Sequence, residues 1–338
     1  MTDGAVARHL DAVRELSRAG HALAPDAPNA TVRNRAWWVD GEPTPSRDRL
    51  HRRLLEQARS EAADVVQGRR AIVLAGPPGA GKSTVLNDLL GEKRRAYLVI
   101  DADEFKRALL REALADGSYE SWLVPDEVRE REAAGERFFP LELASLVHEE
   151  SAYLAQQLRV DAIADGDNVV VDSVLSWEPA AMDLGRSLES ADYSVTVLDV
   201  EVPYELSESR IRARWESVYA TALEGGDSLG GRWVPSEYAR GVFDGPGGKS
   251  KPELVARKLA EDCPAVRQYR LMRTTLVDGQ PHQELEVYRR RAAPGEPLKN
   301  VTAAPKAEQL KPPRRSIDYR VAPAPEPPRQ SGSSPGMH

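Results

Sequence analysis

The chain has 338 residues, of which 41% are hydrophobic, so it is long enough to bury a substantial core. Its 46 Lys and Arg stand against 53 Asp and Glu, and the resulting formal charge of -7 excludes the overall basic surface that is typical of nucleic-acid binders. Cysteine occurs once, at Cys263, which excludes a disulfide framework or a cysteine zinc site within one chain. We therefore expect a globular protein from a reducing compartment that binds no nucleic acid.

The sequence also lacks the features of a membrane protein. No stretch approaches the roughly 20 apolar residues that a membrane span needs. Residues 1–8 contain a single basic residue, and no apolar run follows it. The sequence therefore predicts a cytoplasmic protein with no membrane partner.

Residues 1–44 are expected to form an N-terminal extension that is partly helical. Apolar residues recur there at helical spacing, at Val6, Leu10, Val13 and Leu16, until Pro25 and Pro28 interrupt the pattern. A second helix is predicted from Thr44 and Pro45, a cap residue followed by proline at the first helical position, to Gly68. We expect this second helix to pack beside the core.

From Ala71 the pattern changes to short apolar runs separated by helical stretches, at residues 71–75, 96–100, 168–171 and 193–198. Runs of this kind are typical of strands buried on both faces, so the fold class is α/β, with a parallel sheet flanked by helices. Val266–Val277 and His282–Arg290 flank Asp278-Gly279, which predicts a C-terminal β-hairpin.

Beyond Arg291 the composition changes again. The last 45 residues contain ten prolines and almost no apolar clusters, so they cannot bury enough surface to offset the entropy lost on ordering. The expected organisation is an extension at 1–44, a kinase-like domain at 45–292 and a disordered Pro-rich tail at 293–338.

The strongest functional signal is a phosphate-binding loop, Gly-Pro-Pro-Gly-Ala-Gly-Lys-Ser at residues 76–83, between a predicted strand and a predicted helix. Its glycines let successive N–H groups point inward, and the positive end of the following helix adds to the attraction for phosphate. We expect Lys82 to contact the β- and γ-phosphates, and Ser83 to offer its hydroxyl to Mg²⁺. The residues expected to bind ATP are Gly76, Pro77, Pro78, Gly79, Ala80, Gly81, Lys82, Ser83 and Thr84.

A phosphate-binding loop alone does not separate kinases from other nucleotide hydrolases. The sequence has no N-K-x-D element of the kind that reads the base in switch GTPases, which favours phosphoryl transfer to a small molecule. Asp101 and Asp103 follow the second strand and so lie at the carboxyl edge of the sheet, where ligands of α/β folds bind. Either carboxylate can serve as the base for an acceptor hydroxyl, or can cap the helix predicted at 104–114. Both interpretations stay open for Asp101, and catalysis is favoured for Asp103.

Residues 45–265 resemble the zeta toxin family of bacterial toxin-antitoxin systems. The resemblance rests on GPPGAGKST, on IDADEFK with Asp103 twenty-one residues after Lys82, and on the arginine element from Arg210 to Tyr219 followed by Gly-Arg-Trp at 231–233. It implies a kinase that phosphorylates UDP-N-acetylglucosamine, with Asp103 as the base, and a separate antitoxin protein as partner. It also implies that Arg214 and Arg232 hold the transferring phosphoryl group, a role that suits planar guanidinium groups.

The resemblance further places a substrate-orienting carboxylate on the helix that starts near His148, at Glu149 or Glu150. Ordinary exposed helix acids remain the alternative for each of them. Asp172 follows the third strand and is expected to hold Mg²⁺ or contact substrate, with Ser173 beside it. His148 has no second histidine nearby, which favours a packing role.

The sequence departs from the toxin pattern after the third strand. Asp172-Ser173-Val174 stands where the family has Glu-Gly-Thr, which weakens the prediction of the substrate more than that of the reaction. A different nucleotide-like acceptor, such as NAD, therefore remains an alternative. A regulatory nucleotide-binding module that acts through the Pro-rich tail is another, although Asp103 and the arginine element disfavour it.

Overall fold

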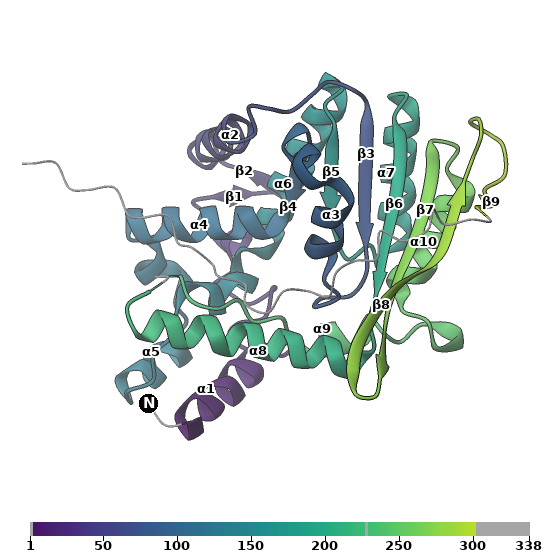
Figure 1. The fold of residues 1–338 in the computed structure, drawn as a ribbon. Helices are drawn as coiled ribbons and strands as arrows, with labels where there is room; N and C mark the ends of the chain where they lie inside the picture. Colours follow the sequence, from purple (N-terminus) through teal and green to yellow (C-terminus); the bar gives the residue numbers. More distant parts are fainter. Residues whose placement is uncertain (1–2, 227–228, 302–338) are drawn as a thin grey trace, which may run out of the picture. The chain divides into compact units, whose positions relative to one another are not determined.

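The computed structural model describes residues 3–226 and 229–301, and Figure 1 shows how their helices and strands are arranged. A seven-stranded sheet in the order β4-β5-β3-β6-β7-β8-β9 forms the centre. Its strands are β3 (Arg70–Ala75), β4 (Leu98–Asp101), β5 (Val169–Asp172), β6 (Ser194–Glu201), β7 (Val266–Val277), β8 (Gln280–Arg290) and β9 (Lys299–Asn300). The strands from β4 to β7 run parallel, and β8 and β9 are antiparallel to their neighbours. The predicted α/β class with a mostly parallel sheet is confirmed.

Helices cover both faces of this sheet. They are α1 (Asp3–Leu16), α2 (Pro45–Ser60), α3 (Lys82–Leu90), α4 (Ala102–Asp116), α5 (Asp126–Ala133), α6 (His148–Asp165), α7 (Glu178–Ser190), α8 (Tyr204–Leu223), α9 (Ser236–Gly241) and α10 (Lys251–Asp262). Short helical turns are η1 (Thr31–Arg33), η2 (Gly91–Ala96), η3 (Tyr119–Leu123), η4 (Pro140–Val147) and η5 (Pro246–Gly248), and β1 (Trp38–Val39) pairs with β2 (Glu42–Pro43) in a separate ribbon.

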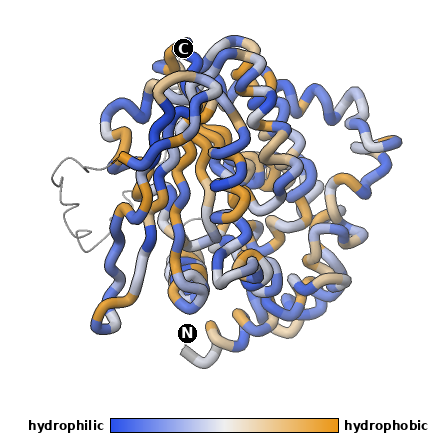
Figure 2. Tube along the Cα trace, turned by 90° about the vertical axis from the view of Figure 1, so that its right-hand side faces the viewer, coloured by the Kyte–Doolittle hydropathy of each residue, from blue (hydrophilic) through white to orange (hydrophobic). Residues whose placement is uncertain are grey.

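Two hydrophobic cores lie on opposite faces of the sheet because strand side chains alternate. Ile72 and Leu74 of β3 pack with Val85 and Leu86 of α3 in the smaller core, whereas alternate residues of the same strand, such as Val73, belong to the larger one. Figure 2 shows apolar residues concentrated on the central strands and polar residues on the surrounding helices. The continuous apolar runs of the sequence are therefore strands buried on both faces.

The hairpin has the predicted turn. Asp278 and Gly279 join β7 to β8, and their φ angles of +50° and +72° are those of a two-residue turn that matches the twist of the strands. The helix predicted in the N-terminal extension is α1, and Leu10, Val13 and Leu16 are buried along one side of it.

Two element boundaries differ from the sequence-based expectation. Helix α2 ends at Ser60, before the predicted end at Gly68. Val66, within the stretch predicted to be helical, instead donates its N–H to the carbonyl of Ala96 and accepts the N–H of Asn168. At the other end, β9 lies within the predicted tail and pairs with β8. Residues 302–338 of that tail lie outside the described residues.

Candidate active site at the carboxyl edge of the sheet

The predicted phosphate-binding loop joins β3 to α3, as its sequence context indicated. Gly76 has a φ of +129°, and a Cβ atom there would lie 2.1 Å from the carbonyl oxygen of Val200, so no other residue fits. Gly81, with a φ of +92°, caps the N-terminus of α3. The helix therefore starts at Lys82 with its N–H groups directed toward the loop.

Lys82 folds back over the loop. Its Nζ donates to the carbonyl oxygens of Gly76, at 3.0 Å, and Pro77, at 3.4 Å. Burial lowers the pKa of Lys82, and attraction to Asp172, Asp101 and Asp103 opposes that shift. Lys82 thus lies between the phosphate-binding loop and the carboxylates of the neighbouring strands.

Helix α8 holds the loop from the other side. Ser207 Oγ donates to the carbonyl of Pro78 at 2.6 Å, and Arg210 Nη1 lies 3.1 Å from the carbonyl oxygen of Gly79 and 3.3 Å from that of Ala80. The sequence singled out Arg214 in this arginine element and gave no role to Arg210. The spacing of three arginines in five residues could not show which of them contacts the loop.

Asp101 and Asp172 lie side by side because β4 and β5 are parallel neighbours in register at these two residues. Asp101 also caps α4, since its Oδ1 accepts the N–H of Asp103 at 2.8 Å. Burial and repulsion from Asp103 and Asp172 raise the pKa of Asp101 to about 7. Burial also raises the pKa of Asp172, although Lys82 attracts its charged form.

Asp103 is held by two cations. Its carboxylate forms an ion pair with Arg232, which lies far along the chain, and another with Lys106 one turn later on α4, at 3.0 Å. Burial opposes ionisation, but Arg232 and Lys106 outweigh it and lower the pKa of Asp103 to about 2. Asp103 therefore stays ionised over the whole physiological range of pH.

The two predicted arginines differ in position. Arg232 reaches Asp103 directly, whereas Arg214 is exposed on α8 and favours the charged form of Asp103 through space. Both guanidinium groups therefore act on the same carboxylate.

The segment after β5 runs beside the phosphate-binding loop. Ser173 Oγ donates to the carbonyl of Leu74 at 3.3 Å, and the N–H of Gly76 donates to the carbonyl of Val174 at 3.2 Å. The peptide that departs from the toxin pattern is thus hydrogen-bonded to both β3 and the loop.

The two acceptor-binding candidates on α6 are placed differently. The Glu149 side chain is exposed. Glu150 is fully buried in an ion pair with Arg47 of α2, with N–O distances of 2.5 and 2.8 Å, and its Oε1 lies 2.6 Å from His51 Nε2. These partners engage both oxygens of Glu150 and join α6 to α2.

Three further residues interact with Asp103: Lys106 and Tyr238, which the sequence analysis did not select, and the exposed His148, for which it favoured a packing role. Lys106 is mostly buried in its ion pair. His148 and Tyr238 both interact electrostatically with Asp103 and Arg232, and Tyr238 also hydrogen-bonds Ser176 just after β5. Only Lys106, one helical turn after Asp103, had a signal in the sequence, its i, i+3 spacing.

The donor set suits a magnesium ion carried by a nucleotide. Within the described residues, no group of three or more His, Cys, Asp or Glu side chains is arranged to hold a metal ion. Mg²⁺ bound to phosphates needs only one or two protein ligands, and the Ser83 hydroxyl and the Asp172 carboxylate, which faces Lys82, are of the required kind.

The family model described as Zeta toxin matches residues 56–249. The chain belongs to the zeta toxin family. This region runs from α2 to the residue before Ser250, and it contains every predicted site residue as well as Arg210, Lys106 and Tyr238. Helix α1 lies outside it.

A segment of 130 residues is 32% identical to a calmodulin calcium-dependent NAD kinase from Arabidopsis thaliana. The aligned part covers 36% of this chain and 21% of the plant protein, so the chain spans about a fifth of that relative.

Two kinds of solved structure are also similar. One is the AvrRxo1-ORF1:AvrRxo1-ORF2 complex, crystallised with sulphate ions (TM-score 0.49, 18% identity, covering 78% of this chain and 72% of the other) and with ATP (TM-score 0.49, 18% identity, covering 77% and 71%). The other comes from the PezAT toxin-antitoxin system of Streptococcus pneumoniae, with a TM-score of 0.45 and 16% identity over 72% of this chain and 82% of that one. In residues 3–226 and 229–301, no helix has the length and apolar character needed to cross a membrane.

Proposed function

We propose that this protein is an ATP-dependent kinase that transfers the γ-phosphate to a hydroxyl group of a nucleotide-type metabolite. The observation that carries the proposal is the position of Asp103, which is ionised and paired with Arg232 at the edge of the sheet that also bears the phosphate-binding loop. In phosphoryl transfer to an alcohol, a carboxylate at this place can accept the proton that the acceptor hydroxyl loses.

In this proposal the residues divide the work. The loop from Gly76 to Thr84 binds the ATP phosphates, and Lys82 neutralises charge on them. Ser83 and Asp172 would hold Mg²⁺, which would supply positive charge to offset that of the phosphates. Asp103 accepts the proton of the acceptor hydroxyl. Its pKa of about 2 makes it a weak base, but a loose transition state deprotonates the nucleophile late and asks little of base strength.

Arg232 has two roles in this scheme. It keeps Asp103 ionised, and its remaining N–H donors can bind the equatorial oxygens of the transferring phosphoryl group. Arg214 adds positive charge on the same side, and Arg210 fixes the loop through the carbonyls of Gly79 and Ala80.

The first acceptor we propose is UDP-N-acetylglucosamine, which the family resemblance implies. A cytoplasmic enzyme of this kind would consume a cell-wall precursor, so its expression should arrest growth and a separate antitoxin protein should bind it. Among the candidate acceptor-binding groups, Asp101, Asp172 and Ser173 lie near the phosphate site, and the exposed Glu149 suits this role better than the ion-paired Glu150.

The second acceptor we propose is NAD. Two observations favour it: the 32% identity to a plant NAD kinase over 130 residues, and the Asp172-Ser173-Val174 peptide, which departs from the toxin pattern next to the phosphate-binding loop. NAD is also a nucleotide-linked metabolite with free ribose hydroxyls, so the same base and arginines would serve.

Labelled ATP with Mg²⁺ and each acceptor in turn tests both proposals on the 338-residue chain. We expect radioactive phosphate to appear in one acceptor and the Lys82→Ala variant to lose the transfer while keeping its melting temperature. Transfer to neither acceptor, with ATP turned over to ADP and phosphate only, would refute the kinase proposal.

A further inference from the structure

Helix α1 lies outside the region that matches the family, yet it packs against the elements that carry the site arginines (Figure 1). We propose that α1 positions Arg232 through a buried chain of contacts that runs from His9 to Glu142 to Trp215, and that His9 is a positioning residue for phosphoryl transfer. The role of Arg232 in this inference rests on the proposed function. The contacts themselves do not depend on it.

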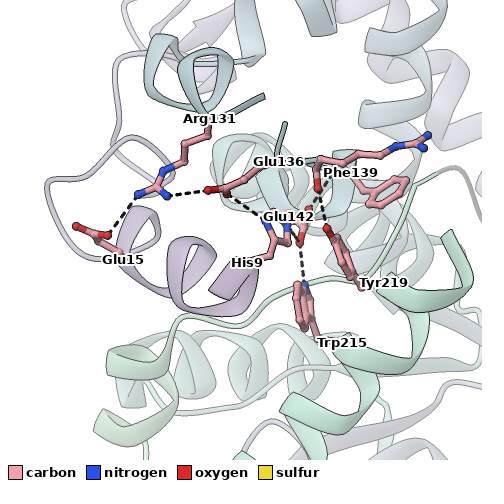
Figure 3. Close-up of polar contacts among 9 residues, drawn as sticks. His9, Glu15, Arg131, Glu136, Phe139, Glu142, Trp215 and Tyr219 are labelled. Carbon is pink, nitrogen blue, oxygen red and sulfur yellow. Dashed lines mark hydrogen bonds and ion pairs between the residues drawn. The ribbon is translucent and has the colours of Figure 1, made fainter. Parts of the chain in front are cut away.

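The first link is His9, which is only 4% exposed and lies between two carboxylates (Figure 3). Its Nε2 lies 3.1 and 3.2 Å from the two carboxylate oxygens of Glu142, and its Nδ1 lies 3.4 Å from Glu136 Oε2. The ring stacks on Tyr219 of α8, with centroids 4.7 Å apart. His9 therefore joins α1 to both η4 and α8.

The second link is Glu142, whose side chain has no exposed surface. Besides His9, it accepts hydrogen bonds from the N–H of Phe139 at 2.8 Å and from Trp215 Nε1 at 3.1 Å. Burial raises the pKa of Glu142, and the bonds from His9, Phe139 and Trp215 oppose that shift. A buried carboxylate is tolerated only with such partners, so loss of His9 would disturb the remaining bonds, including that of Trp215.

The third link is Trp215, which lies under the segment that carries Arg232. A Cβ atom on Gly231 would come within 2.8 Å of the Trp215 carbonyl oxygen and 3.2 Å of its ring, and the rings of Trp215 and Trp233 meet edge to face at 6.2 Å. Both neighbours of Arg232 in the sequence are thus packed on Trp215. The direction in which Arg232 leaves the backbone, toward Asp103, is fixed by this packing.

A second contact of α1 reaches the same segment. Arg14 bridges to Glu208 of α8 at 3.3 Å, and its guanidinium lies 6.0 Å from the ring centroid of Trp233. The same helix also lines a groove with Pro235, Ser236 and Glu237, which follow Arg232 along the chain. Helix α1 therefore contacts the residues that follow Arg232 directly, in addition to the chain of contacts that reaches Arg232 through Trp215.

Simple stabilisation does not require this arrangement. The apolar side of α1, with Leu10, Val13 and Leu16, already buries the helix in the core. The imidazole of His9, buried between two carboxylates, adds a directional contact. It holds Glu142 in place, Glu142 holds Trp215, and Trp215 in turn packs under the residues on both sides of Arg232. Misplacing a catalytic group by about 1 Å costs up to about a hundredfold in rate, so a remote contact of this kind can control turnover.

The test compares His9→Ala with His21→Ala, a change at an exposed histidine beyond the end of α1, in the 338-residue chain. His9→Gln is the conservative variant, because its amide can still donate to Glu142, and it replaces His9→Ala if that variant does not fold. We expect His9→Ala to bind MgATP within about twofold of the parent, to exchange the backbone amides of residues 229–234 faster, and to leave exchange in β3 and α3 unchanged.

If one of the two acceptors is phosphorylated, kcat of His9→Ala should fall about tenfold or more with an unchanged KM for ATP, and His9→Gln should recover part of the loss. If neither acceptor is phosphorylated, the proposed function fails, and the exchange measurement alone decides the inference. Unchanged exchange at 229–234 would overturn it. So would uniformly faster exchange with weaker ATP binding, which is the signature of a merely structural residue.

Discussion

Asp101 and Asp103 are two residues apart, yet their surroundings drive their pKa values in opposite directions, to about 7 and about 2. Asp101 is repelled by Asp103 and by Asp172 at the end of β5, whereas Asp103 is one turn from Lys106 and in contact with Arg232. Asp103 is therefore ionised at physiological pH and able to accept a proton, whereas Asp101 is about half protonated near neutral pH.

The first prediction separates their roles in catalysis. Asp103→Asn keeps the shape of the side chain but cannot accept a proton, so turnover should fall by roughly a hundredfold or more. Asp101→Asn should act more weakly, because asparagine also caps a helix well. Single-turnover kinetics at saturating ATP, with calorimetric ATP titration as the control, measures both. If Asp103→Asn is active and Asp101→Asn is inactive, Asp101 is the catalytic base and Asp103 has the supporting role.

The second prediction concerns pH and stability. The pKa of Asp101 rises from its ordinary 3.8 to about 7 on folding, so the folded state holds an extra proton between these values. This contribution to stability is complete below pH 3.8 and is lost as the pH rises through 7. Asp101→Asn removes the dependence, so its free energy of unfolding relative to the parent should increase between pH 4 and 8, by up to about 4 kcal/mol for a shift of about three pKa units. Urea titrations of both proteins at pH 4 and pH 8 check the sign. A difference between variant and parent that stays the same, or decreases, from pH 4 to pH 8 would contradict the prediction.

At the scale of elements, α2 and α6 are joined by one buried ionic group. Glu150 binds Arg47 and His51, and the Arg47 guanidinium also lies 4.2 Å from the ring centroid of Trp37. Sequence alone could not choose between Glu149 and Glu150, because two adjacent helix acids look alike until their faces are known. The faces are set by tertiary packing, and one is exposed while the other is buried.

The third prediction follows from that difference. Glu150→Gln leaves Arg47 and His51 without their carboxylate in a buried position, which should cost about 3–5 kcal/mol of stability. Glu149→Gln, at the exposed neighbour, should change stability by less than about 0.5 kcal/mol. Denaturant unfolding of both variants provides the comparison. If Glu150→Gln is as stable as the parent but has a raised KM for the acceptor, Glu150 binds the acceptor and this prediction is wrong.

Elements with a strong local signal could be predicted from the sequence. The glycine-rich loop, the apolar strands and the Asp278-Gly279 hairpin each require particular residues at fixed spacing, and all three are in the structure. Contacts between distant segments could not be predicted. Nothing in the sequence around Arg232 indicates that it pairs with Asp103, or that His9 reaches Glu142, because these pairs form only when the whole chain packs.

At the scale of the whole molecule, the described chain is larger than the region matched by the family. Helix α1 precedes residues 56–249, and α10 with the β7, β8 and β9 strands follows them, yet all belong to the same compact unit. We propose that the folded kinase unit includes both the extension and the strands up to Val301, in place of the boundary at 292 that the composition suggested.

The last prediction tests that boundary with two truncations. Deleting residues 302–338 should leave melting temperature and ATP binding unchanged, because that Pro-rich segment offers few apolar residues to bury. Deleting 295–338 also removes β9 and Leu298, which packs partly buried against the main core. Losing that burial should cost on the order of 1 kcal/mol, which lowers the melting temperature by about 2 °C in a domain of this size. Differential scanning calorimetry of the two truncated proteins beside the full chain resolves this difference. Equal melting temperatures for the two truncated proteins would place the boundary back at 292. A large drop in melting temperature on deletion of 302–338 would show that residues after 301 contribute to the core.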